Sequence, residues 1–168
     1  MSLWYCSIYK KLKPKLKQWA LNPFDWLLPG SHKVYNLDQL DEKRYKDKIF
    51  YKPRWINEDG LEQRMIISFS PKYKNYQSTV HQGQIDRALK LIDSNGKIPR
   101  NTNQNDYRRF IEDIKTTKDD EVAEKSHLFL DEGKIEIEAI YDGFYAVCTS
   151  LEGDARQIIQ INKNRWQI

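Results

Sequence analysis

The 168-residue chain has few of the side chains from which metal sites and catalytic motifs are built. Its two cysteines, Cys6 and Cys148, lie near opposite ends, and its three histidines show no His-x-x-x-His spacing. A zinc site needs several such ligands at short spacing, so the sequence gives no support for one. His32, His81 and His127 are each interpreted as surface or packing residues.

Long apolar runs and phosphate-binding loops are also missing. The longest apolar stretches, such as residues 65–70, are far too short to cross a bilayer, and no charged segment followed by an apolar one marks a secretory signal. Neither Gly-x-x-x-x-Gly-Lys nor Gly-x-Gly-x-x-Gly occurs, so nucleotide binding has no motif. We expect a reduced, cytoplasmic protein without a membrane-inserted part.

Charge and aromatic residues are plentiful and unevenly placed. The 28 Lys and Arg exceed the 24 Asp and Glu only slightly, but residues 10–17 contain five lysines and no acid. Five Trp and ten Tyr occur in the chain, several of them in lysine-rich surroundings. This mixture suits base stacking and phosphate contact. It also suits rings that are half-buried on a sheet under lysine stems, and composition leaves both interpretations open.

Three segments show helical periodicity. In residues 158–168, Ile158, Ile159, Asn162 and Trp166 fall on one face at helical spacing, which predicts a helix there. Leu12, Leu16 and Trp19 recur at spacings of four and three, which predicts a short helix starting near Pro14. Within residues 70–97, apolar side chains recur at helical offsets before Asn-Gly, so we expect a long helix there.

Five runs rich in Ile, Phe, Tyr and Val are predicted to be strands: residues 48–56, 61–70, 127–130, 134–140 and 144–150. Asp59-Gly60 and Asp142-Gly143 predict two antiparallel hairpins, and the second pair is expected to form a turn rather than bind magnesium.

Three further expectations follow from these strands. Pro53 indicates an edge or a bulge of the sheet. Cys148 is expected to be a buried small hydrophobe. The predicted class is α+β, with an antiparallel β-rich lobe and a long helix packed on it.

The alternation of Ile135 and Ile137 with Glu136 and Glu138 has a specific consequence. Side chains of a strand point alternately to its two faces. Both carboxylates are therefore expected on the solvent side of a half-exposed strand.

Four stretches resemble, in order and separation, the DDE transposases of bacterial insertion sequences, of the insertion-sequence-four type. They read GLEQRMIISFSPKY, QIDRALKLI, IEAIYDGFYAVCTSLEGD and IIQINKNRWQI. The likeness spans residues 8–168 and is most specific over the last forty. It implies a ribonuclease H-like fold in which two Asp and one Glu bind two Mg²⁺ ions that cut and rejoin DNA at transposon ends.

The family's last catalytic helix carries the signature Tyr, two residues, Arg, three residues, Glu, six residues, Lys. Arg165 matches the Arg and Asn162 stands at the Tyr position, while the Glu would follow Ile168. The family's two Asp precede a β-rich insertion that residues 8–126 resemble. The resemblance therefore implies no catalytic carboxylate, no bound metal or cofactor and no strand cleavage by this chain alone.

The same resemblance divides the chain into a β-rich insertion subdomain, residues 1–126, and a partial ribonuclease H-like core, residues 127–168. The expected partners are transposon-end DNA and a second copy of the chain that covers the severed core. Ile158, Ile159 and Trp166 are expected in the core. The predicted DNA contacts are Arg165, Lys163 and Asn162, and on the insertion Arg54, Trp55, Lys72, Lys74 and Tyr76.

Two other functions stay open at this stage. One is a non-catalytic DNA-binding module that uses the basic and aromatic surface. The other is a protein-interaction domain whose aromatic residues are simply core.

Overall fold

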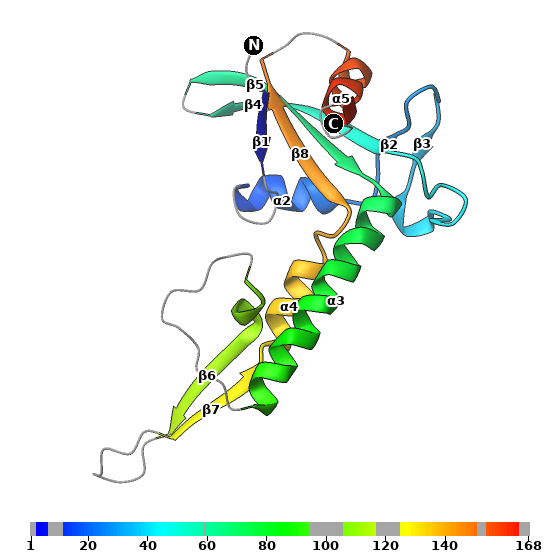
Figure 1. Ribbon diagram of the computed structural model, residues 1–168. Coiled ribbons are helices and arrows are strands. Elements are labelled where there is room, and N and C mark those ends of the chain that lie inside the picture. Colours follow the sequence, from blue (N-terminus) through cyan, green and yellow to red (C-terminus); the bar gives the residue numbers. More distant parts are fainter. Residues whose placement is uncertain are drawn as a thin grey trace. The chain divides into compact units, whose positions relative to one another are not determined.

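The computed structural model describes residues 3–6, 12–58, 60–94, 106–116, 125–150 and 154–164. The chain divides into two compact units (Figure 1). Unit 1 comprises Met1–Asn75 and Gly143–Ile168, and unit 2 comprises Tyr76–Asp142. None of the helices within the described ranges is both long and apolar enough to cross a membrane.

Unit 1 is built on a six-stranded antiparallel sheet with the order β1-β8-β5-β4-β2-β3. Strands and helices share one chain without alternating βαβ units, so the predicted α+β class is confirmed. The strands are β1 (Leu3–Cys6), β2 (Trp26–Leu27), β3 (Val34–Tyr35), β4 (Phe50–Glu58), β5 (Leu61–Phe69) and β8 (Phe144–Thr149).

The β4–β5 hairpin forms where the sequence predicted it. Glu58 pairs with Leu61, which leaves a two-residue loop, and Gly60 has φ of 80°. Glycine adopts this left-handed conformation without a steric cost, and such turns match the twist of the paired strands. Pro53 pairs with Ile66, while β2 contacts β4 only at Tyr51. Within the described residues, Pro53 thus lies on an outer edge of the sheet, as expected.

Two helices cover the two faces of this sheet. α5 (Ala155–Asn164) packs Ile158 and Ile159 against Tyr51, Ile66 and Val147, which share one face by register. α2 (Pro14–Leu21) starts at the predicted proline and lies on the opposite face, where its last carbonyls meet Lys52.

The predicted core residues of unit 1 are confirmed wherever they are described. Ile158 and Ile159 are buried, and Cys148 is buried on β8. Trp166 lies outside the described residues.

Unit 2 contains the part of α3 (Pro71–Asp93) from Tyr76 onward, together with the 3₁₀ helix η2 (Tyr107–Phe110) and α4 (Glu132–Ala139). Its strands β6 (Ile111–Thr116) and β7 (Lys125–Leu130) form a two-stranded antiparallel sheet. The long helix predicted within residues 70–97 is confirmed. It begins at Pro71, a favoured first helical residue, and the Ser70 hydroxyl accepts a hydrogen bond from the Tyr73 amide at 3.4 Å.

The strand predicted at residues 134–140 is wrong, because this segment is the helix α4. Asp131 caps it, since its Oδ1 accepts a hydrogen bond from the Lys134 amide at 2.9 Å. Glu, Lys, Ala and Ile are compatible with a helix as well as with the alternating pattern of a strand. The cap from Asp131 favours the helix. Asp142-Gly143 consequently joins a helix to β8, and the second predicted hairpin is wrong as well.

We expect Gly143→Ala to destabilise unit 1 by about 3 kcal/mol. Gly143 has φ of 87°, and an added Cβ would lie 2.8 Å from both Lys74 Cβ and Phe69 Cε2. Gly30→Ala is the matched control, because Gly30 has φ of 81° but nothing within 4 Å, so only backbone strain of about 1 kcal/mol is expected there. Urea denaturation measures both losses, and equal losses would refute the steric argument.

Candidate functional site

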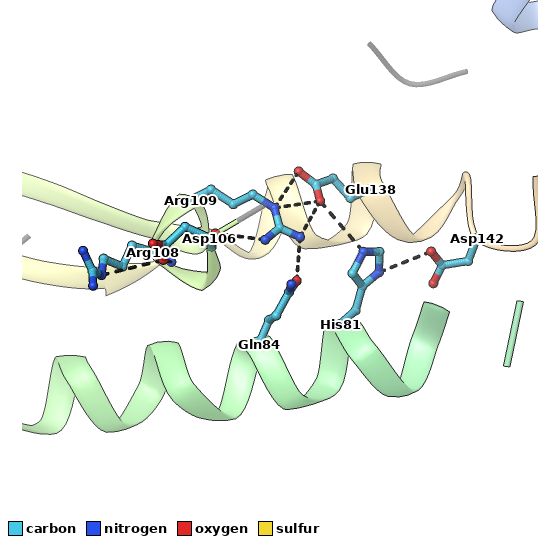
Figure 2. Close-up of polar contacts among 7 residues, drawn as sticks. All are labelled: His81, Gln84, Asp106, Arg108, Arg109, Glu138 and Asp142. Carbon is cyan, nitrogen blue, oxygen red and sulfur yellow. Dashed lines mark hydrogen bonds and ion pairs between the residues drawn. The ribbon is translucent and has the colours of Figure 1, made fainter. Parts of the chain in front are cut away.

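A cluster of polar side chains lies within unit 2 (Figure 2). It consists of His81, Gln84, Arg109, Glu138 and Asp142, and we call it the Arg109 network. His81 and Gln84 are three residues apart on α3, so they share one face of that helix. Glu138 and Asp142 lie at the end of α4 and in the turn that follows it.

Arg109 is the centre of this network. Its Nε donates to Glu138 Oε2 at 3.0 Å and Oε1 at 3.3 Å, and its Nη2 lies 3.0 Å from Oε2. Nη2 also donates to Gln84 Oε1 at 2.7 Å, and Nη1 donates to the Asp106 carbonyl at 2.9 Å. The two charged side chains are only 10% and 11% exposed. A two-point ion pair with so little solvent fixes the relative position of η2 and α4.

His81 lies between two carboxylates. Its Nδ1 is 3.2 Å from Asp142 Oδ1, and its Nε2 is 4.0 Å from Glu138 Oε2. The ring also contacts the buried Phe110 edge-to-face, with 6.1 Å between the ring centroids. The His81 side chain therefore bridges α3 and the turn that follows α4.

This geometry supports a structural role better than a catalytic one. In a hydrolytic triad one imidazole nitrogen faces a carboxylate and the other a hydroxyl or thiol nucleophile. Here both ring nitrogens face carboxylates. Among the described residues, no group of three or more His, Cys, Asp or Glu side chains is placed to hold a metal ion. The buried apolar residues in the described part of unit 2 are Ala88 and Phe110, so the Arg109 network lies beside a small apolar core.

Sequence reasoning missed this network for two reasons. His81 was interpreted as a surface or packing residue, and Glu138 was placed on the solvent side of a strand, which is wrong because Glu138 lies on α4 and points to Arg109. Glu138 and Asp142 are four residues apart, but α4 ends at Ala139, so this spacing gives no helical signal. Nothing in the sequence pairs them with Arg109.

The structure separates Arg54 and Trp55, which the sequence grouped on one DNA-facing side. Adjacent strand residues point to opposite faces. The Arg54 guanidinium lies over Trp19 of α2, 5.5 Å from the ring centroid. Trp55 therefore points to the other face, where its side chain is 50% exposed.

The other predicted DNA contacts have different surroundings. Lys72 is exposed on α3, and Tyr76 is an exposed aromatic residue of the same helix. The Lys74 ammonium lies 2.7 Å from Glu42 Oε1, so its charge is balanced locally. Residues 162 and 163 belong to α5, but the side chains of Asn162 and Lys163, and all of Arg165, lie outside the described residues.

The self-association predicted from the severed core stays a prediction. Ile158 and Ile159 are buried in unit 1. An exposed apolar surface that attracts a second copy would therefore have to use other residues.

Lys52 is a functional group that the sequence analysis did not single out. It is buried, with 3% of its surface exposed, and its Nζ donates to the carbonyls of Trp19 at 2.9 Å and Asn22 at 2.7 Å. The same ammonium lies 4.6 Å from the Trp26 ring centroid. Burial disfavours the charged form and lowers the pKa of Lys52 to about 8, although the charge of Asp25 acts in the opposite direction.

We expect Arg109→Met to destabilise the protein by about 3–5 kcal/mol, because it leaves the Glu138 carboxylate buried without its partner. The double variant Arg109→Met/Glu138→Met should recover part of this loss, since both charges are then removed. Arg108→Met is the control: Arg108 is more exposed and lies 3.7 Å from Asp106, so a loss within about 1 kcal/mol is expected. Chemical denaturation measures all three variants, and a double variant no more stable than Arg109→Met would contradict this account.

The contribution of Lys52 to stability should rise with pH. Its pKa of about 8 lies below the ordinary value of 10.5, so between these values the folded state binds fewer protons than the unfolded chain. Stability then increases as pH rises through this window, by up to roughly 3 kcal/mol. Denaturation of the wild type and of Lys52→Met at pH 7 and pH 10 measures the part of the pH-dependent free energy of unfolding that Lys52 contributes. A difference between the two proteins that does not change with pH would disprove the lowered pKa.

Comparison with known proteins adds no assignment to this geometry: no family model, no curated protein and no solved structure matches the chain.

Proposed function

We propose that this chain takes part in DNA transposition, as a piece of a DDE transposase of the insertion-sequence-four type. Residues 1–126 would be the β-rich insertion, and residues 127–168 would include the start of the last catalytic helix of a ribonuclease H-like core. The resemblance of four ordered stretches to that family is the basis of the proposal.

The observation that carries the proposal is α5. The signature requires a helix at the position of Asn162, and α5 runs through it from Ala155 to Asn164. Ile158 and Ile159 anchor this helix on the sheet of unit 1, next to β8 residue Val147. A helix held in this way keeps a constant orientation, which a residue that contacts a DNA phosphate needs.

The role proposed for the signature positions in this sequence is DNA contact. Two-metal phosphoryl transfer requires carboxylates that hold both ions, whereas Asn162 and Arg165 are not carboxylates. A stand-alone DNA-binding module is the second candidate function. It is favoured by the exposed cations Lys15 and Arg54 beside Trp19 in unit 1.

The coding DNA beyond codon 168 tests the family assignment. The signature places Glu at the next position and Lys after six further residues, in the same frame or in an interrupted one. Sequencing this region should therefore show both codons at that separation. Their absence from all three frames would remove the transposase proposal and leave the DNA-binding module.

A further inference from the structure

The lysine-rich segment near the N-terminus forms a basic surface on α2. Lys13 and Lys15 are exposed at the start of this helix, and Lys17 is partly exposed one turn later. The helix contains no acidic residue. The helix itself therefore offers Lys15 no carboxylate partner.

Arg54 extends this surface from the neighbouring strand. Lys15 precedes Trp19 by four residues, so both lie on the same side of α2. The exposed Arg54 guanidinium lies over the Trp19 ring. A guanidinium held over a ring by cation–π attraction still has N–H donors that a phosphate can accept.

The support beneath this surface is well fixed. The carbonyl of Trp19 accepts a hydrogen bond from Lys52, and the Lys52 ammonium lies 5.4 Å from the Trp19 ring centroid. Lys52 is buried, so its own charge acts from below the surface rather than as a direct contact. Asp25 is the acid whose charge acts on Lys52 there.

Other lysines of unit 1 lie in mixed-charge surroundings. Lys43, Lys46 and Lys48 are exposed in a segment that also contains Asp41, Glu42 and Asp47. A polyanion approaching that segment meets both signs of charge. Approaching α2 and Arg54, it meets cations supported by an aromatic ring.

We propose that Lys13, Lys15 and Arg54 contact the phosphates of duplex DNA, with Trp19 as the platform that orients Arg54. This inference rests on the proposed function for the choice of DNA as the polyanion. It assigns the contact surface of unit 1 to α2 and β4, and it does not need Lys72, Lys74 or Tyr76.

The test is a salt series of DNA-binding titrations with a mixed-sequence duplex, using the full chain. Log affinity falls as log salt rises, and each lost phosphate contact makes this line less steep by about 0.9. Lys13→Gln/Lys15→Gln/Arg54→Gln should therefore make it less steep by about 2.7, and affinity at 0.1 M salt should fall at least about tenfold. Lys13→Gln/Lys15→Gln, which keeps the Arg54–Trp19 contact, should make it less steep by about 1.8.

Lys43→Gln/Lys46→Gln/Lys48→Gln is the matched control, because it removes the same charge from exposed lysines of the same unit. It should leave the slope nearly unchanged, and thermal unfolding checks that each variant is folded. Equal losses in both triple variants would show diffuse attraction and overturn the α2 surface. Polyglutamate should displace the bound duplex less effectively than unlabelled duplex does at equal charge. Equally effective displacement by the two polyanions would overturn DNA as the partner.

Absence of wild-type binding at 50 mM salt would also overturn this surface. That result would not test the transposase assignment, which the sequence of the coding DNA beyond codon 168 tests separately. The two proposals therefore fail on different measurements.

Discussion

The burial of β5 on both faces is the constraint on which unit 1 depends. Residues 65–70 are all buried, although neighbours in a strand point to opposite faces. Such a strand is stable only if each face is covered: α5 packs on Ile66 at one face, and Trp26 contacts Phe69 at the other. Lys52 follows from the same constraint: its position on β4 faces α2, so its ammonium is buried and must find acceptors. The carbonyls at the end of α2 supply them.

Unit 2 is held together by a different balance of forces. Its described part has few buried apolar side chains, and the Arg109 network connects α3, η2 and α4 instead. A buried ion pair adds little net stability over an apolar pair, but it tolerates only a narrow geometry. The network therefore specifies how the helices of this unit meet more than it increases the free energy of unfolding.

The sequence predicted the features that local chemistry determines. Pro14 starts α2, Gly60 permits the β4–β5 turn, and Ile158 and Ile159 form the apolar side of α5. It failed at residues 134–140, where alternating Ile and Glu fit a strand and the cap from Asp131 selects a helix. The Arg109 network was not predictable, because Arg109 is 25 residues from Gln84 and 29 from Glu138, and these side chains meet only through packing. Arg54 and Trp55 are neighbours in a strand, so they point to opposite faces of the sheet. This separation could have been inferred from the sequence, because residues 48–56 were already predicted to form a strand.

The distribution of cations bears on function more than their number does. Arg109 is paired with Glu138, Lys74 with Glu42, and Lys52 with backbone carbonyls, so these positive charges are already used within the fold. A count of Lys and Arg therefore overstates what a polyanion can contact. The α2 helix itself contains no acid, and the Lys52 contact that closes its last turn also fixes Trp19. Lys52 of β4 thus also holds in place the ring over which the exposed Arg54 lies.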